Sequence, residues 1–163
     1  RYCMEDDVMS VVSREIESIQ WYVNTFDIRY GEMAHVEYAL EPQAGECAVP
    51  RMILQPLVEN AFLHGFVGKK PSGGLLRIAG QVEEGWVRIE VENSGAPLDD
   101  AAVERMNSAD SGMRKHRGIG ISNVRKRVEI LGGEGAYLKY RARAGGGCVA
   151  TIRFPLLGNR GKQ

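Results

Sequence analysis

The stretch from Leu75 to Asn93 constrains the fold of this chain more than any other. Its two halves, "LLRIAGQV" (75–82) and "WVRIEVEN" (86–93), carry alternating apolar side chains and are separated by Glu83-Glu84-Gly85. Two such runs joined by a short glycine-bearing turn predict a β-hairpin. The chain is therefore expected to contain an antiparallel sheet.

Helical and strand patterns flank this hairpin on both sides. Helices are expected at about 10–30, 50–65, 98–106 and 119–131, and further strands at 35–40, 135–142 and 146–156. Pro50 is assigned to the first turn of the second helix. The segment 107–118 has no apolar period and is expected to be a mobile loop. This order predicts a two-layer α/β sandwich, a mixed and mostly antiparallel sheet with helices on one face.

Composition narrows the functional classes. The 163 residues suit one domain, and 21 basic residues balance 21 acidic ones. The balance argues against bulk attraction to nucleic acid, so no nucleic-acid partner is expected. The three cysteines are far apart and predict neither a disulfide framework nor a metal cluster. No apolar run is long enough to span a bilayer, and the first residue is not Met, so the chain is interpreted as a cytosolic fragment.

The stretch "HRGIGISNVRKRV" (116–128) places Gly118 and Gly120 just where a helix is expected to begin. Backbone N–H groups at such a turn, together with the helix dipole, favour anions. The stretch lacks the third glycine of a dinucleotide fingerprint, and the chain has no Walker loop. Taken alone, the two glycines fit either a phosphate-binding turn or an ordinary flexible loop.

Two further stretches also fit either a ligand-binding role or an ordinary structural one. Asn60 falls at the edge of the apolar face of the second helix, with His64 one turn later on the same side. Their ordinary roles would be a hydrogen bond to a neighbouring backbone group and a contact with the helix dipole. Asn93-Ser94-Gly95 directly follows a strand, where an asparagine commonly begins a turn.

Taken in order, "LQPLVENAFLHG", "VRIEVENSGAP" and "GIGISNVRKRV" resemble the N, G1 and G2 boxes of the ATP-binding domain of sensor histidine kinases of the LytS type. The stretches "EIESIQWYVNTFDIRYGE" and "GGGCVATIRFPL" are similar to the helix before that domain and to its last hairpin. The resemblance implies the Bergerat-type ATP-binding fold, which gyrase and Hsp90-type ATPases share.

The resemblance also implies roles for particular residues. Asn60 would coordinate Mg²⁺, Asn93 would recognise the adenine amino group, and Gly95 would let the base approach closely. The loop from about 97 to 117 would form a lid over ATP. The candidate contacts to ATP and its metal are Asn60, His64, Asn93, Gly95, Arg117, Gly118, Gly120 and Asn123.

Several positions depart from the family pattern. Asn93 stands where an aspartate is usual, Pro97 replaces a second glycine, and Leu63 stands where a basic residue is common. These departures keep open a catalytically decayed module that senses nucleotide or binds a protein. Hydrolytic relatives carry a glutamate one turn before the metal-binding asparagine, where this chain has Pro56, so slow intrinsic hydrolysis is expected.

The implied organisation is a helical segment at 1–31, an ATP-binding catalytic domain at 32–157 and a flexible tail at 158–163. No histidine lies in 1–30, so the phosphoacceptor is assigned to an upstream dimerisation region outside this chain. The expected partners are that region and a response regulator. The full-length protein is expected to be a membrane-bound homodimer with this domain in the cytosol, and the fragment alone is a candidate monomer. A serine kinase or ATPase on the same fold is the third alternative, although the first helix resembles that of the histidine kinases.

Overall fold

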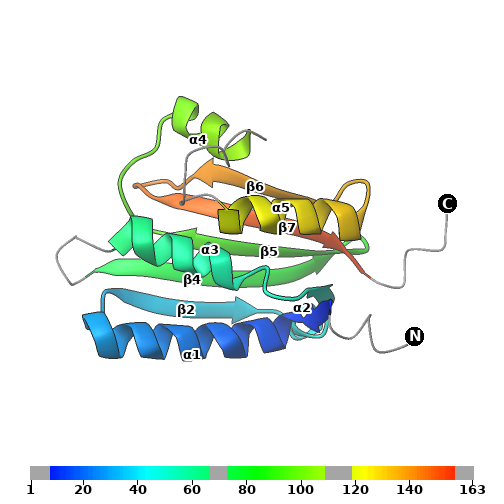
Figure 1. Cartoon of the computed structure of the whole chain (residues 1–163), viewed down its shortest axis with the longest axis horizontal. Helices are drawn as coiled ribbons and strands as arrows, with labels where there is room; N and C mark the ends of the chain where they lie inside the picture. The colour runs from blue at the N-terminus through cyan, green and yellow to red at the C-terminus, as the bar shows by residue number, and fades with distance from the viewer. Residues whose placement is uncertain (1–7, 67–72, 109–118, 157–163) are drawn as a thin grey trace.

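A computed structural model describes residues 8–66, 73–108 and 119–156 of the chain. Its main sheet has the strand order β2-β4-β5-β7-β6, in which β2 is parallel to β4 and all other neighbours are antiparallel. The strands are β2 (Ala34–Leu40), β4 (Gly74–Glu83), β5 (Trp86–Asn93), β6 (Tyr137–Ala142) and β7 (Cys148–Pro155). This mixed, mostly antiparallel sheet confirms the expected α/β class (Figure 1).

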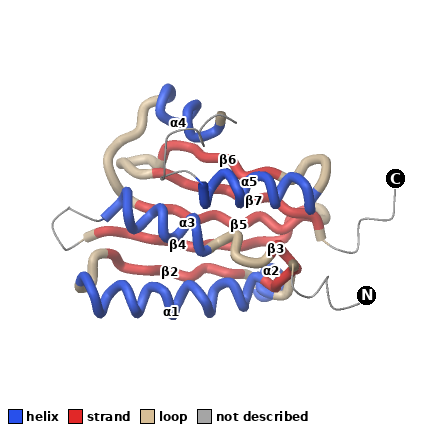
Figure 2. The backbone as a smooth tube through the Cα atoms, viewed as in Figure 1, coloured by secondary structure: helices blue, strands red, loops and turns tan. Residues whose placement is uncertain are grey.

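Three helices lie across one face of this sheet. Helix α3 (Gln55–Ala61) lies between α1 (Val12–Tyr30) and α5 (Ile119–Gly132) and contacts both (Figure 2). Helix α4 (Asp100–Asn107) lies against the edge strand β6, and the short α2 (Pro42–Gly45) packs against β4. The layer of helices covers the apolar side of the sheet and places the start of α5 beside α3.

Side chains of β5 alternate between the inner and outer faces of the sheet, which explains why an asparagine lies in the core. Val87, Ile89 and Val91 are buried between the sheet and the helices, and Asn93 continues the same alternation with 6% of its surface exposed. A buried amide requires hydrogen-bond partners, since an unpaired one costs about 1–3 kcal/mol. The strand therefore delivers one polar group to the inside of the fold at its carboxyl end.

The expected helix at 50–65 was wrong at its start. Pro50 ends strand β3 (Ala48–Pro50), which pairs with β1 (Met9–Val11), and the helix begins only at Gln55, with Pro56 in its first turn. Both prolines suit a helix start, and the pairing of β3 with β1 leaves only the second one available. After Ala61 the chain passes into a π-helical turn, η1 (Phe62–Phe66).

A buried carboxylate satisfies the backbone between Pro50 and α3. Glu15, on α1, is 6% exposed and accepts hydrogen bonds from the backbone N–H groups of Met52 (2.8 Å), Ile53 (3.0 Å) and Leu54 (3.3 Å). Charge-assisted bonds of this kind are stronger than neutral ones. Helix α1 is therefore tied to the helix that carries Asn60 by hydrogen bonds as well as by apolar packing.

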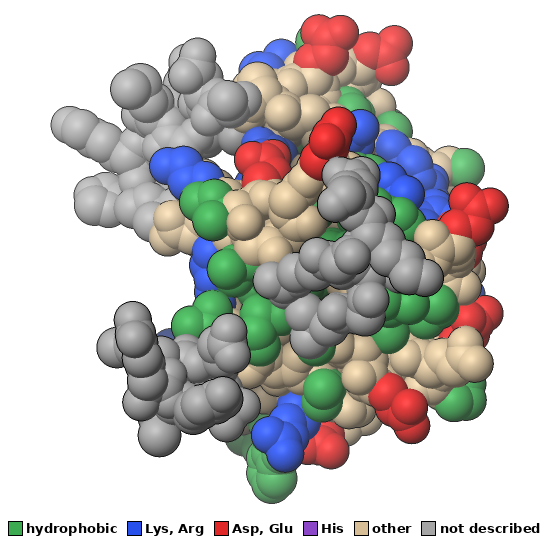
Figure 3. Space-filling model, turned by 90° about the vertical axis from the view of Figure 1, so that its right-hand side faces the viewer, with side chains coloured by type: hydrophobic (Ala, Val, Ile, Leu, Met, Phe, Trp, Pro, Cys, Tyr) green, Lys and Arg blue, Asp and Glu red, His purple; other side chains and the backbone are tan. Residues whose placement is uncertain are grey.

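The remaining expected elements agree with the structure to within a few residues. Most of the expected loop at 107–118 and the expected tail at 158–163 lie outside the described residues. Among the described helices, none is both long and apolar enough to cross a membrane. The end of the molecule shown in Figure 3 carries acidic and basic side chains interspersed with one another.

Candidate functional site

A cavity of about 350 Å³ opens where α3, the carboxyl end of β5, the amino end of β7 and helix α5 meet. The side that we call the strand side is formed by Asn93, Tyr140 and Cys148, from the sheet, and by Gly147, from the turn before β7. Asn60 and His64, from α3 and η1, form its helix side. Apolar side chains of Leu98, Met106 and Ile121 complete the wall, and no Lys or Arg is among the described residues that line it.

The amide of Asn93 is fixed in one orientation. Its Nδ2 donates to the carbonyl oxygen of Ser94 (3.0 Å), and its Oδ1 accepts from the thiol of Cys148 (Sγ to Oδ1 3.1 Å). Because a carbonyl only accepts, the Ser94 oxygen must face the nitrogen of the amide, which turns the amide oxygen toward the thiol. Asn93 and Cys148 are opposite partners in the pairing of β5 with β7.

Burial keeps the Cys148 thiol protonated. It raises the pKa of Cys148 to about 11, so the thiol remains a hydrogen-bond donor throughout the neutral range. Tyr140 is 6% exposed, and burial, with a smaller contribution from Cys148, raises its pKa above the ordinary value. The strand side is therefore uncharged at neutral pH, with Asn93 and Tyr140 buried and Cys148 half-buried.

Close backbone packing explains the glycines around Asn93. A Cβ at Gly147, whose φ is +103°, would overlap the carbonyl oxygen of Asn93, and a Cβ at Gly146 would overlap that of Gly95. A Cβ at Gly65 would lie 3.0 Å from Asn93 Nδ2. The glycine-rich turn between β6 and β7, interpreted from the sequence only as a turn, is thus packed directly against the Asn93-Ser94-Gly95 segment.

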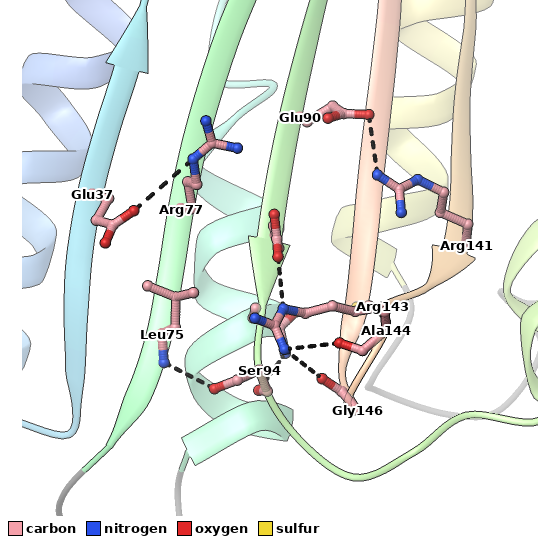
Figure 4. Close-up of polar contacts among 12 residues, drawn as sticks. Glu37, Leu75, Arg77, Glu90, Ser94, Arg141, Arg143, Ala144 and Gly146 are labelled. Atoms are coloured by element: carbon pink, nitrogen blue, oxygen red, sulfur yellow. Dashed lines mark hydrogen bonds and ion pairs between the residues drawn. The ribbon is translucent and has the colours of Figure 1, made fainter.

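Side chains on the outer face of the sheet hold the same segment. Ser94 exchanges two hydrogen bonds with Leu75 of β4: its N–H donates to the Leu75 carbonyl (2.9 Å), and its hydroxyl accepts from the Leu75 N–H (2.8 Å). Arg143 pairs with Glu92 at 2.6 Å and also donates to the carbonyl oxygen of Gly146 at 3.3 Å (Figure 4). The turn that carries the glycines is thereby fastened to β5.

The helix side differs in exposure. Asn60 is half-buried and His64 is exposed, and among the described residues neither side chain has a hydrogen-bond partner within the protein. Glu59 does not line the cavity and accepts a hydrogen bond from Gln55 Nε2 (2.9 Å). Asn60 Oδ1 is therefore the oxygen on this side that remains available to a hard cation, whose preferred ligands are oxygens.

Of the other residues singled out in the sequence, some line the cavity and others do not. Gly95 lines the cavity, whereas Gly120 packs beside Pro56 and Asn123 is exposed, and neither of the last two lines it. Arg117 and Gly118 lie outside the described residues. Leu98, Met106, Ile121, Tyr140 and Cys148 line the cavity without having been singled out, because nothing in their local sequence distinguishes them from ordinary core residues.

The described part of the expected lid contains an anchored helix. Arg125 of α5 donates to the carbonyl oxygens of Met106 (2.7 Å) and Ser108 (3.2 Å) at the end of α4. The side chain of Asn107 donates to the Tyr140 carbonyl (2.8 Å) and accepts from the Tyr140 N–H (2.7 Å). These bonds connect the end of α4 to α5 and to β6, so Met106 is held against the cavity.

Comparison with known sequences identifies the family. Residues 48–158 match the family described as histidine kinase-, DNA gyrase B-, and HSP90-like ATPase. The chain belongs to this family and is a histidine kinase-type ATPase catalytic domain, a membership that implies ATP binding. The family resemblance seen in the sequence is thereby confirmed.

Particular relatives are sensor kinases. The chain is 31% identical over 136 residues to Sensor histidine kinase YpdA of Escherichia coli (strain K12) and 26% identical over 153 residues to Sensor histidine kinase YesM of Bacillus subtilis (strain 168). The matches cover 83% and 93% of this chain but 23% and 25% of the relatives. The chain thus spans about a quarter of their length.

Solved structures share the fold. The catalytic domain of histidine kinase ThkA has a TM-score of 0.71 at 19% identity, covering 91% of this chain and 96% of that one. A structure of ThkA in complex with response regulator protein TrrA has a TM-score of 0.67 at 18% identity, covering 93% of this chain and 42% of that one. At these identities the likeness establishes the architecture.

Proposed function

We propose that this domain binds ATP with Mg²⁺ in the cavity between α3 and the sheet and transfers the γ-phosphate to a histidine on an upstream dimerisation helix of its parent protein. The observation that carries the proposal is the meeting of Asn60 and Asn93 on one cavity, which Gly95 also lines. Adenine would lie on the strand side, beside Asn93. The triphosphate would extend along the helix side toward the start of α5, where Gly118 and Gly120 lie in the sequence.

The donor set on the helix side fits magnesium held largely by the nucleotide. Mg²⁺ keeps several waters and is commonly bound by one or two protein oxygens together with substrate phosphates. Asn60 offers one such oxygen, and no cluster of three or more ligating side chains occurs among the described residues. When bound, the ion would neutralise charge on the transferring phosphate. Asn60 would hold it at the mouth of the cavity.

The arrangement favours transfer over hydrolysis. Pro56 occupies the place one turn before Asn60 where a water-activating glutamate would be needed, and Glu59 is engaged with Gln55. No described carboxylate lines the cavity. Without a carboxylate to act as general base among the described lining residues, water attack on the γ-phosphate is expected to be slow, which preserves the phosphate for a protein acceptor.

The partners follow from the same proposal. Trp21 and Ile28 of α1 are 76% and 88% exposed and lie about two turns apart, so the helix carries two large apolar side chains outside the domain core. These side chains support an upstream dimerisation region that contains the phosphoacceptor. The complex of ThkA with response regulator protein TrrA supports a response regulator as the final acceptor. We further propose a cytosolic location for this domain in a homodimeric, membrane-bound parent.

The test is calorimetric titration with a non-hydrolysable ATP analogue, with and without Mg²⁺, on the wild type and Asn60→Ala. We expect magnesium-dependent binding that weakens at least about tenfold in the variant, because the charge-assisted metal contact is lost, with the free energy of unfolding unchanged within about 0.5 kcal/mol. Binding that ignores both the ion and the substitution would contradict this placement of the metal.

A phosphotransfer assay distinguishes an active kinase domain from the catalytically decayed module. The chain is mixed with ATP and a fragment of its parent that carries the acceptor helix, and phosphohistidine is measured. Nucleotide binding without phosphotransfer would favour the sensing or interaction module, for which Asn93, Pro97 and Leu63 are the supporting departures.

A further inference from the structure

Tyr140 is a buried polar residue with no partner for its hydroxyl. It lies in the middle of β6, is 6% exposed and lines the same cavity as Asn93. None of the described residues forms a hydrogen bond with its hydroxyl, which is buried. Buried tyrosine hydroxyls usually find a partner, and an unsatisfied one is destabilising. The missing partner therefore points to a group that enters the cavity.

The neighbouring polar groups already have partners within the protein. The Cys148 thiol donates to Asn93, and the Asn93 amide donates to Ser94. The backbone N–H and carbonyl of Tyr140 are both bonded to the side chain of Asn107. The Tyr140 hydroxyl is thus the polar group of the strand side for which the described residues provide no partner, on a residue whose backbone is hydrogen-bonded to Asn107.

The surroundings select the kind of ligand group. The wall near the sheet is completed by Leu98, Met106 and Ile121, and no described cationic side chain lines the cavity. A phosphate would require cations or a set of N–H donors, whereas a flat heterocycle suits an apolar wall. Purine ring nitrogens accept hydrogen bonds, and a neutral phenol donates one.

We propose that the Tyr140 hydroxyl hydrogen-bonds the purine base of the bound nucleotide and so determines base affinity together with Asn93. This inference rests on the proposed nucleotide site. It makes Tyr140, which lies outside the three motifs singled out in the sequence, a contact to the base.

The test uses Tyr140→Phe, which removes the hydroxyl and keeps the ring. A non-hydrolysable ATP analogue is expected to bind about three- to tenfold more weakly, the loss of one neutral hydrogen bond. The thermal midpoint of the ligand-free variant is expected to stay the same or rise, because an unsatisfied buried group is removed. Tyr137→Phe, on the same strand but outside the cavity, is the matched control and should change neither quantity.

A titration with inorganic triphosphate and Mg²⁺ shows whether the Tyr140 hydroxyl contacts the base or the phosphates of the nucleotide. Triphosphate should bind the wild type and Tyr140→Phe with the same affinity. If the substitution weakens triphosphate binding as much as it weakens binding of the ATP analogue, the assignment of the hydroxyl to the base is overturned. If the wild type binds the ATP analogue and the variant binds it equally well, the inference fails and the proposed function stands. A lowered thermal midpoint in the ligand-free variant would show that the hydroxyl is structural and also overturn the inference. Absence of nucleotide binding by the wild type would overturn both.

Discussion

The two sides of the cavity are built in opposite ways. On the strand side, Asn93 and Tyr140 are each 6% exposed, and Asn93 is tied to Ser94 and Cys148 by hydrogen bonds. On the helix side, Asn60 is half-buried, His64 is exposed, and neither has a described partner. The strand side is therefore fixed by the fold before a ligand arrives, and the helix side keeps its polar groups for the ligand. Substitutions of the groups that hold the strand side together should change stability, and substitutions on the helix side should change binding.

The largest effect is expected from Gly147→Ala. Its Cβ would overlap the Asn93 carbonyl oxygen and lie 2.8 Å from two backbone carbons of Ser94, at a φ of +103°. Because backbone rather than flexible side chain must move, we expect a loss of about 3 kcal/mol or more in the free energy of unfolding, measured with urea.

Gly133→Ala is the control for backbone strain alone. Gly133 has a φ of +72°, with no atom within 4 Å of the added Cβ, and should cost only about 1 kcal/mol. Equal losses in the two variants would show that the close packing against Asn93 contributes nothing, and the contrast between the two sides of the cavity would weaken.

A smaller effect is expected from the pH dependence of stability that Cys148 creates. Its folded pKa of about 11 lies above the value of about 8.5 expected for an unfolded thiol. The folded state therefore binds this proton more tightly, and the stabilisation is complete below the unfolded pKa and lost as pH rises through the folded one. Between pH 8.5 and 11 the wild type should lose about 2–3 kcal/mol from this group.

Cys148→Ser isolates that contribution. Serine keeps a donor to Asn93 but does not titrate in this range, so the other ionisable groups cancel in the comparison. Urea titrations at several pH values should give a steeper decline for the wild type. If the free energy of unfolding falls equally with pH in both proteins, burial on the strand side does not raise the pKa of the Cys148 thiol.

Most of the fold was predictable because strand alternation and helical periodicity are local. The hairpin of β4 and β5 and the inward phase of Val87, Ile89 and Val91 follow from single runs of sequence. The start of α3 did not, since the choice between Pro50 and Pro56 depends on the distant pairing of Met9 with Pro50. Glu15 gave a usable signal, an acidic residue beside the apolar face of α1, but its partners could not be inferred locally.

The residues of the site likewise divide into those that local sequence predicts and those that depend on distant strand pairing. Asn60 and Asn93 were predicted because they belong to ordered motifs, and the structure places both on one cavity. Tyr140 and Cys148 were missed because β6 and β7 look like ordinary core strands. Cys148 meets Asn93 only through the register of β5 against β7, which no local pattern specifies. The sequence thus predicts the residues that lie in ordered motifs better than those that strand pairing alone brings to the cavity.

The smallest effect is expected from His64→Ala, which tests whether the helix side is as open as it looks. The side chain is exposed and has no described partner, so the free energy of unfolding should change by less than about 0.5 kcal/mol. Binding of the ATP analogue should weaken by no more than about twofold, since an exposed contact to phosphate is screened by solvent. A tenfold loss, measured beside Asn60→Ala, would instead assign to His64 the phosphate contact that Leu63 cannot make, and would extend the ligand-binding part of the helix side by a full turn.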